Sequence, residues 1–143
     1  MKKLLAKKVR MTQIFSEEGL ALPVTVVMPV EAEEATFDEG EMVTVSGLSK
    51  GKGFQGVVKR HGFHGGPRSH GQKHSEREPG SISGGGGRAG GRVAKGIRMA
   101  GRMGGTRITV KNLRIAKVLS DTKEILIVGA IPGRRGTLLQ IKN

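Results

Sequence analysis

Residues 48–111 form a glycine-rich, strongly basic stretch that constrains the fold of this chain more than any other feature. They hold 18 of the 24 glycines and carry 14 Lys and Arg residues against two acidic ones. Residues 1–47 carry five basic and eight acidic residues, and residues 112–143 carry six and two. Nearly all of the formal net charge of +13 therefore lies in the middle of the chain.

The composition of this stretch argues against a packed core. Glycine loses the most backbone entropy on ordering and brings no side chain to bury. Unstructured loops longer than about 15 residues are uncommon in compact domains unless they are functional or disordered. The basic residues are spread along the stretch, which suits contact with a polyanion over its whole length. We expect residues 48–111 to be an extension that an anionic partner helps to order.

The chain as a whole has the charge of a nucleic-acid-binding protein, with a sequence pI near 10.8. It has no cysteine, which excludes disulfides and thiolate metal sites. It has no apolar run long enough for a membrane span and no signal-peptide pattern. We expect a soluble protein that is not exported, with no membrane partner, no small-molecule substrate and no cofactor.

The pattern of the N-terminal flank, residues 1–47, predicts short strands. Period-two alternation predicts a strand at residues 9–15 that forms a hairpin with residues 20–30. Pro23 and Pro29 should confine the second strand to a sheet edge or divide it in two. The acidic residues 31–41 are interpreted as a surface connection with one helical turn at most, and a further strand is predicted at residues 42–46.

The C-terminal flank, residues 112–143, continues the β pattern. Strands are predicted at residues 106–118, with a bulge near Asn112, at residues 125–131 and at residues 138–141. The two flanks thus offer five or six short strands and no long helix. A small antiparallel β-barrel is the predicted architecture, because closing the sheet removes the edges that short strands would expose.

Two nucleotide-binding motifs are matched only in part. Gly51, Gly53 and Gly56 fit the dinucleotide pattern G-x-G-x-x-G, but Gly62 and Pro67 interrupt the helix that the pyrophosphate would need. The KGKGF sequence at residues 50–54 resembles half of an RNA-recognition motif without its second aromatic residue. The chain has four Phe and no Tyr or Trp, so we expect phosphate neutralisation and shape recognition of folded RNA rather than base stacking.

All four histidines lie within 14 residues, as His61, His64, His70 and His74. Their spacing raises the alternative of a metal site, but few carboxylates are near and glycines interrupt any helix that would gather the rings. Contacts with RNA, or plain solvation in a loop, fit them better. Acid–base or nucleophilic catalysis has less support still, because the acidic residues lie mostly at 17–41 and no serine carries a nucleophile-elbow motif.

Longer motifs give the chain a resemblance. KKVRMTQIF at residues 7–15, VSGLSKGKGFQGVVKRHGFHGGPRSHG at 45–71, KGIRMAGRMGGTRITVKNLRI at 95–115 and ILIVGAIPGRRG at 125–136 resemble, in this order, the universal large-subunit ribosomal protein L3 family in its bacterial or organellar form. The chain resembles a shortened form of that family, because residues 30–41 bridge directly where the family has a subdomain.

The resemblance implies a β-barrel of the kind found in translation proteins, from which the basic loop reaches toward the peptidyl transferase centre. It implies a structural constituent of the large ribosomal subunit, not an enzyme, that binds large-subunit ribosomal RNA, supports subunit assembly and contacts neighbouring ribosomal proteins. The expected location is a cytoplasmic ribosome, with an organellar one as an alternative. A free-standing β-barrel RNA-binding protein, such as an RNA chaperone, is the alternative function.

The expected domains are a barrel body, residues 1–47 with 112–143, and an RNA-penetrating extension, residues 48–111. The resemblance and the charge pattern together predict RNA contacts at Lys50, Lys52, Lys59, Arg60, His61, His64, Arg68, His70, Lys73, Arg77, Arg88, Arg92, Lys95, Arg98, Arg102, Arg107 and Lys111. The tip of the loop is expected at Ser83, Gly84, Gly85, Gly86, Gly87, Arg88, Gly90, Gly91 and Arg92.

Overall fold

The computed structural model of the protein describes residues 2–30, 37–82 and 93–143. The chain divides into two compact units. Met1–Lys50 and Gly105–Asn143 form the first, which we call the barrel unit, and Gly51–Gly104 form the second, which we call the extension unit.

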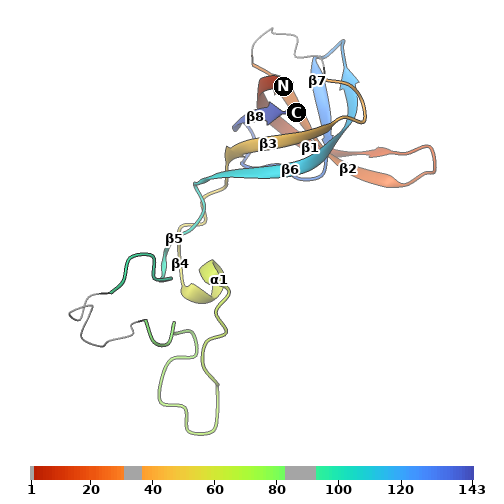
Figure 1. The fold of residues 1–143 in the computed structure, drawn as a ribbon. Helices are drawn as coiled ribbons and strands as arrows, with labels where there is room; N and C mark the ends of the chain where they lie inside the picture. Colours follow the sequence, from red (N-terminus) through yellow and green to blue (C-terminus); the bar gives the residue numbers. More distant parts are fainter. Residues whose placement is uncertain (1, 31–36, 83–92) are drawn as a thin grey trace. The chain divides into compact units, whose positions relative to one another are not determined.

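The described residues of the barrel unit form a closed antiparallel barrel, with strands in the order β1-β2-β7-β6-β3-β8 and β8 paired back to β1 (Figure 1). The strands are β1 (Lys3–Phe15), β2 (Ala21–Pro29), β3 (Met42–Leu48), β6 (Arg107–Leu119), β7 (Glu124–Val128) and β8 (Leu138–Lys142). The expected small antiparallel β-barrel is confirmed. Strand β6 includes residues 107–111, which lie both in the predicted strand at residues 106–118 and in the predicted extension, residues 48–111.

Alternating apolar residues fill the barrel. On β3, for example, Val43 and Val45 are buried while Met42 is exposed, as the two-residue period of a strand requires. The interior is formed by Leu4, Ala6, Val27, Phe37, Val43, Val45, Ile115, Ile125, Ile127, Ile131, Leu139 and Ile141. Because every strand contributes to one core, a charge placed there would destabilise the whole unit.

The predicted hairpin of β1 and β2 is confirmed, but the expected edge position of β2 is wrong. β2 lies between β1 and β7 as a single strand. It pairs with β7 only over residues 24–27, so Pro23 and Pro29 both lie outside that ladder and their missing N–H groups leave no gap in it. β1 also begins at Lys3, six residues before the predicted start, because residues 3–7 pair with β8.

β-Bulges change which face of the sheet a strand buries. The predicted bulge near Asn112 is confirmed: Val43 pairs with Leu113 and Val45 with Val110, and Asn112 has a φ of +57°. Further register shifts lie beside Val9 on β1 and Ala116 on β6. Both residues pack against a second, smaller cluster, which is built on Val24, Val26 and Leu126.

The acidic connection between β2 and β3 is described only from Phe37 onward, so the expected helical turn in residues 31–36 lies outside the described residues. Phe37 is 3% exposed and packs in the barrel core, which corrects the expectation of a purely surface segment. Its ring also faces the ammonium of Lys2, whose Nζ is 5.9 Å from the ring centroid.

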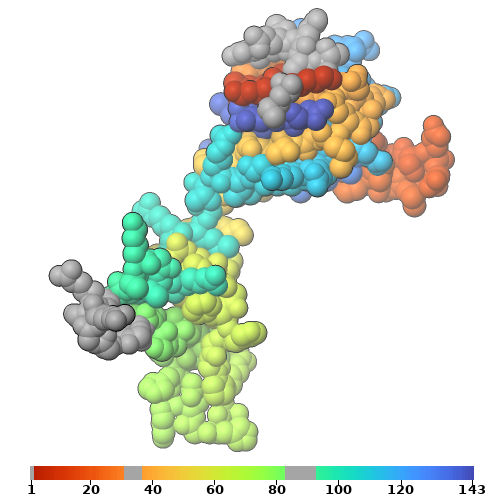
Figure 2. Space-filling view, in the orientation of Figure 1, coloured from red at the N-terminus to blue at the C-terminus, as the bar shows by residue number. Residues whose placement is uncertain are grey.

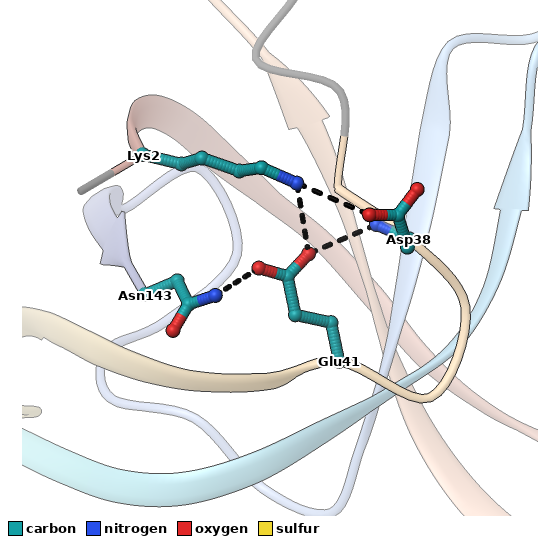
Figure 3. Close-up of polar contacts among 4 residues, drawn as sticks. All are labelled: Lys2, Asp38, Glu41 and Asn143. Carbon is teal, nitrogen blue, oxygen red and sulfur yellow. Dashed lines mark hydrogen bonds and ion pairs between the residues drawn. The ribbon is translucent and has the colours of Figure 1, made fainter.

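A polar cluster brings the first described residue and the last residue of the chain to this connection (Figure 3). Lys2 Nζ lies 3.2 Å from Asp38 Oδ2 and 3.4 Å from Glu41 Oε2. The Asp38 amide and the Asn143 side-chain amide both donate to the Glu41 carboxylate. These donors, with the Asp38 amide as the largest contributor, lower the pKa of Glu41 below its ordinary value.

The extension unit contains little regular structure. A short pair of strands, β4 (Phe54–Gln55) and β5 (Gly101–Arg102), forms a separate two-stranded sheet. Between them lies one turn and a half of helix, α1 (Val57–His61), which ends where Gly62 adopts a left-handed φ of +74°. Within the described residues, no helix has the length and apolar character needed to cross a bilayer.

Candidate nucleic-acid interface

The extension unit has almost no core. Among its described residues, Val57 is the only buried hydrophobic side chain. Backbone hydrogen bonds hold its two ends together instead: the Lys52 amide donates to the Met103 carbonyl at 2.8 Å, and the Met103 amide to the Gly53 carbonyl at 2.9 Å. Such a unit has little hydrophobic stabilisation of its own, since that term grows with the apolar area buried.

Two side chains of α1 fasten the returning segment just before β5. Arg60 Nη1 donates to the Met99 carbonyl at 2.6 Å, and His61 Nε2 lies 3.0 Å from the same oxygen. Gly101 permits this approach, because a Cβ atom there would lie 2.8 Å from Arg60 Nη1. Both Arg60 and His61 are half-buried, so part of their bonding capacity is used inside the unit.

A second loop is closed by a backbone contact that requires glycine. The Gly66 amide donates to the Glu76 carbonyl at 2.8 Å. Gly65 has a φ of +77°, and a Cβ atom there would lie 1.9 Å from the same carbonyl oxygen. Arg68 adds an ion pair, with Nε 2.8 Å from Glu76 Oε2. This pair is exposed to solvent, so we expect it to contribute well under 1 kcal/mol to stability.

An open cavity of about 600 Å³ lies in the extension unit. Its lining includes His61, His64, His74, Glu78 and Arg98, together with the backbone of several glycines. Within the described part of the chain, which contains all four histidines, no three His, Asp or Glu side chains are grouped as a metal ion would need. The charged side chains in this lining are Arg98 and Glu78, so the cavity offers one positive and one negative group rather than a set of metal ligands.

Most of the basic residues predicted to contact RNA are exposed. In the extension unit these are Lys52, Lys59, His64, Arg68, His70, Lys73, Arg77, Lys95, Arg98 and Arg102. In the barrel unit, Lys50, Arg107 and Lys111 are also exposed, and Arg107 Nη2 donates to Gln140 Oε1 at 2.8 Å. Arg88, Arg92 and the rest of the predicted tip, residues 83–92, lie outside the described residues.

Residues 132–137 form a basic loop on the barrel unit that was not among the predicted RNA contacts. Its Arg134 and Arg135 are exposed, while the loop backbone is fixed to β1 by Lys8. The Lys8 amide donates to the Thr137 carbonyl at 3.0 Å, and the Gly136 amide donates to the Lys8 carbonyl at 2.7 Å. The pattern PGRRG was visible as a basic turn. Its fixed geometry was not, because the anchor is distant in sequence.

Lys8 also anchors this loop through its side chain, which is only 7% exposed. Its Nζ donates to the Ile131 carbonyl at 2.8 Å and to the Gly133 carbonyl at 3.1 Å. Burial, and secondarily the positive charge of Lys50, lower the pKa of Lys8 below its ordinary value. The barrel unit thus presents Lys50, Arg134 and Arg135 as exposed positive charges around a buried ammonium group.

Comparison with known proteins identifies the family. A sequence model described as ribosomal protein L3 matches residues 9–131. The chain belongs to the ribosomal protein L3 family. The match includes the barrel strands β2, β3, β6 and β7 and the whole extension unit, so the family resemblance seen in the motifs is confirmed.

Individual relatives support this assignment. The chain is 52% identical over 113 residues to the large ribosomal subunit protein uL3 of Chlorobium limicola, which covers 79% of this chain and 52% of the relative. It is 44% identical over 131 residues to uL3 of Chlorobium phaeovibrioides, with 92% and 61% covered, and 51% identical over 105 residues to uL3 of Herpetosiphon aurantiacus, with 73% and 49% covered. The chain thus spans about half to three-fifths of the length of these relatives.

Proposed function

We propose that the chain is a structural constituent of the large ribosomal subunit that binds folded ribosomal RNA and supports subunit assembly. The relatives are named as large-subunit proteins, and membership of their family supports the same setting for this chain. In this proposal the barrel unit is a folded anchor, and the extension unit is ordered within RNA. The chain acts by binding, with no catalytic step.

The observation that carries this proposal is the combination of charge and missing core in residues 51–104. They hold 11 Lys and Arg residues against two acidic ones. Val57 is their one buried hydrophobic residue in the described part, and nearly all of their described basic side chains are exposed. A segment of this kind repels itself in isolation, and RNA phosphates would relieve that repulsion.

The ligand is proposed to be folded RNA rather than a free single strand. Phe54 is 73% exposed, whereas Phe63 is half-buried beside the His61 ring, so the unit has few surfaces on which successive bases could stack. Exposed Lys and Arg side chains instead suit phosphates brought together by RNA folding. The predicted approach of residues 83–92 to the peptidyl transferase centre remains part of this proposal.

Arg134 and Arg135 are proposed as a second RNA contact, on the barrel unit. The four hydrogen bonds between Lys8 and residues 131–137 support this, because a fixed loop loses little entropy when its side chains bind. Lys50 adds a third exposed positive charge near the buried ammonium of Lys8.

Competition binding tests the proposed ligand. Labelled large-subunit RNA is bound to the full chain at fixed salt and displaced with unlabelled ribosomal RNA or with poly-uridine. We expect ribosomal RNA to compete far more strongly per nucleotide than poly-uridine. Equal competition would instead support the alternative of a free-standing single-strand binder or RNA chaperone.

A further inference from the structure

The hairpin of β1 and β2 extends beyond the closed part of the barrel. β1 pairs with β8 only over residues 3–7, and β2 pairs with β7 only over residues 24–27. Beyond these points residues 13–15 and 21–23 continue as a two-stranded ribbon closed by a turn, and residues 9–12 of β1 pair with a strand on one side only. We call residues 9–23 the hairpin arm. Figure 1 shows this ribbon passing the other strands, and Figure 2 shows it as an orange-red lobe.

The edge of β1 that faces away from β2 has unpaired backbone groups. The direction of the Pro23 carbonyl identifies the residues to which these groups belong. The Pro23 carbonyl accepts from the Gly129 amide at 2.8 Å, so it points away from β1. Gln13 is paired with Pro23, and it therefore belongs to a non-hydrogen-bonded pair whose backbone groups point away from β2. By the two-residue period, those of Met11 and Phe15 point the same way. In the described part of the chain no other strand pairs there.

The same residues expose apolar side chains. Met11 is 47% exposed and Phe15 is 67% exposed, and Leu20 in the adjoining turn is 59% exposed. Alternation places Met11, Gln13 and Phe15 on one face of the ribbon. An exposed edge strand with apolar side chains invites pairing with another chain, and native proteins normally cover or block such edges. This edge has no proline and no lysine from residue 9 to residue 15.

The charge of the arm differs from that of the rest of the protein. Its turn carries Glu17 and Glu18, both exposed, and its only basic residue is Arg10. Arg10 itself lies 3.9 Å from a Glu124 carboxylate oxygen. The arm therefore has a net charge of −1 in a chain of +13. The two exposed carboxylates of the turn are complementary to the positive charges of a basic polypeptide, and not to RNA phosphates.

We propose that the free edge of β1 in the hairpin arm receives an extended strand from another, basic protein. The strand adds to the ribbon by backbone hydrogen bonds at Met11, Gln13 and Phe15, the mode known as β-augmentation. Its alternate apolar residues lie beside Met11 and Phe15, and a Lys or Arg meets the acidic turn. This inference rests on the proposed function, which places the chain in a particle with other proteins.

Site-directed photo-cross-linking tests the proposal. A tagged full-length chain carrying the Phe15→p-benzoylphenylalanine substitution is assembled into large subunits, which are purified and irradiated. We expect a cross-link to one extended, Lys- or Arg-containing peptide of another protein, identified by mass spectrometry. Adding Gln13→Pro, which removes an edge N–H but no β1–β2 hydrogen bond, should lower the yield at least about tenfold. The matched Gln13→Ala variant should keep the yield.

Other results would overturn the proposal. They are a cross-link mainly to RNA, a cross-link to a second copy of this chain, no cross-link, or a yield that Gln13→Pro leaves unchanged. Should Gln13→Pro not fold, the paired Glu17→Lys and Glu18→Lys substitutions provide the test, and an unchanged yield counts against the proposal. A tagged chain that never enters large subunits is recognised before irradiation and overturns the proposed function together with this inference.

Discussion

The Nζ atom of Lys8 lies 2.8 Å from the carbonyl oxygen of Ile131, across 123 residues of sequence. This contact, with the second one to the Gly133 carbonyl, joins the first strand to the loop that precedes the last strand. A lysine in a chain with a net charge of +13 would ordinarily be expected to contact an anionic ligand. Here the ammonium group instead fixes the backbone of the loop that exposes Arg134 and Arg135.

We expect Lys8→Met to destabilise the barrel unit. The substitution keeps an unbranched side chain but leaves the Ile131 and Gly133 carbonyls without their donor, which typically costs about 1–3 kcal/mol. Chemical denaturation measures the change in the free energy of unfolding. Lys3→Met is the matched control, since Lys3 lies exposed on the same strand. Equal losses in the two variants would show that the buried ammonium has no special role.

We expect Ile127→Asp to abolish folding of the barrel unit. Ile127 is 0% exposed, and a carboxylate buried there would lose its hydrating water without gaining a hydrogen-bond donor. The free energy of unfolding should therefore fall by at least about 4 kcal/mol. Ile108→Asp is the control, because Ile108 is 42% exposed. Thermal unfolding followed by far-ultraviolet circular dichroism gives the answer, and a wild-type transition for Ile127→Asp would contradict the described core.

The Glu41 cluster predicts an acid dependence of stability. The pKa of Glu41 is lowered in the folded state from its ordinary value of 4.5. The Glu41 carboxylate therefore stabilises the fold above pH 4.5, and this stabilisation is lost as the pH falls through the lower pKa of the folded state. The difference in unfolding free energy between the wild type and Glu41→Gln should therefore shrink below pH 4.5. Denaturation curves at several pH values measure it. Glu17→Gln, in the exposed turn, serves as control, and a difference that grows toward low pH would reverse the assignment.

Neighbouring residues of α1 should separate structural from RNA-binding roles. Arg60 donates to the Met99 carbonyl, whereas Lys59 is exposed. We expect Arg60→Ala to speed amide exchange at Lys52 and Met103, and Lys59→Ala to leave it unchanged. If Lys59 contacts a phosphate, its variant should reduce the slope of log affinity against log salt by about 0.7–0.9. An Arg60→Ala variant with unaltered exchange would show that its contact does not hold the unit together.

The sequence predicted what depends on local patterns. The β1–β2 hairpin and the bulge near Asn112 followed from alternation and from a residue type that tolerates a positive φ. The interior position of β2 could not be predicted from the sequence. Pro23 is compatible with it only because the pairing of β2 with β7 stops at residue 24, and the sequence does not show where that pairing stops. The burial of Lys8 was also not predicted, because it depends on a loop that is distant in sequence. The burial of Phe37 was not predicted because its neighbours in sequence are acidic, which suggested an exposed segment.

In the extension unit the sequence indicated charge but not geometry. Its glycines were interpreted as freedom from structure, yet Gly65 and Gly101 are places where the backbone is approached by Glu76 and by Arg60. Glycine composition alone cannot distinguish flexibility from close contact, because both need a missing Cβ atom. The RNA-binding residues remain predictions, supported by exposure and charge.

Hydrogen exchange of the full chain, free and bound to large-subunit ribosomal RNA, tests the central proposal most directly. The proposal predicts that the amides of residues 51–104 exchange faster than those of β2 and β7 in the free protein and at least about tenfold more slowly on the RNA, while the β2 and β7 amides are protected in both states. Equal protection of residues 51–104 with and without RNA would contradict it, because the extension unit would then be stable without its proposed ligand.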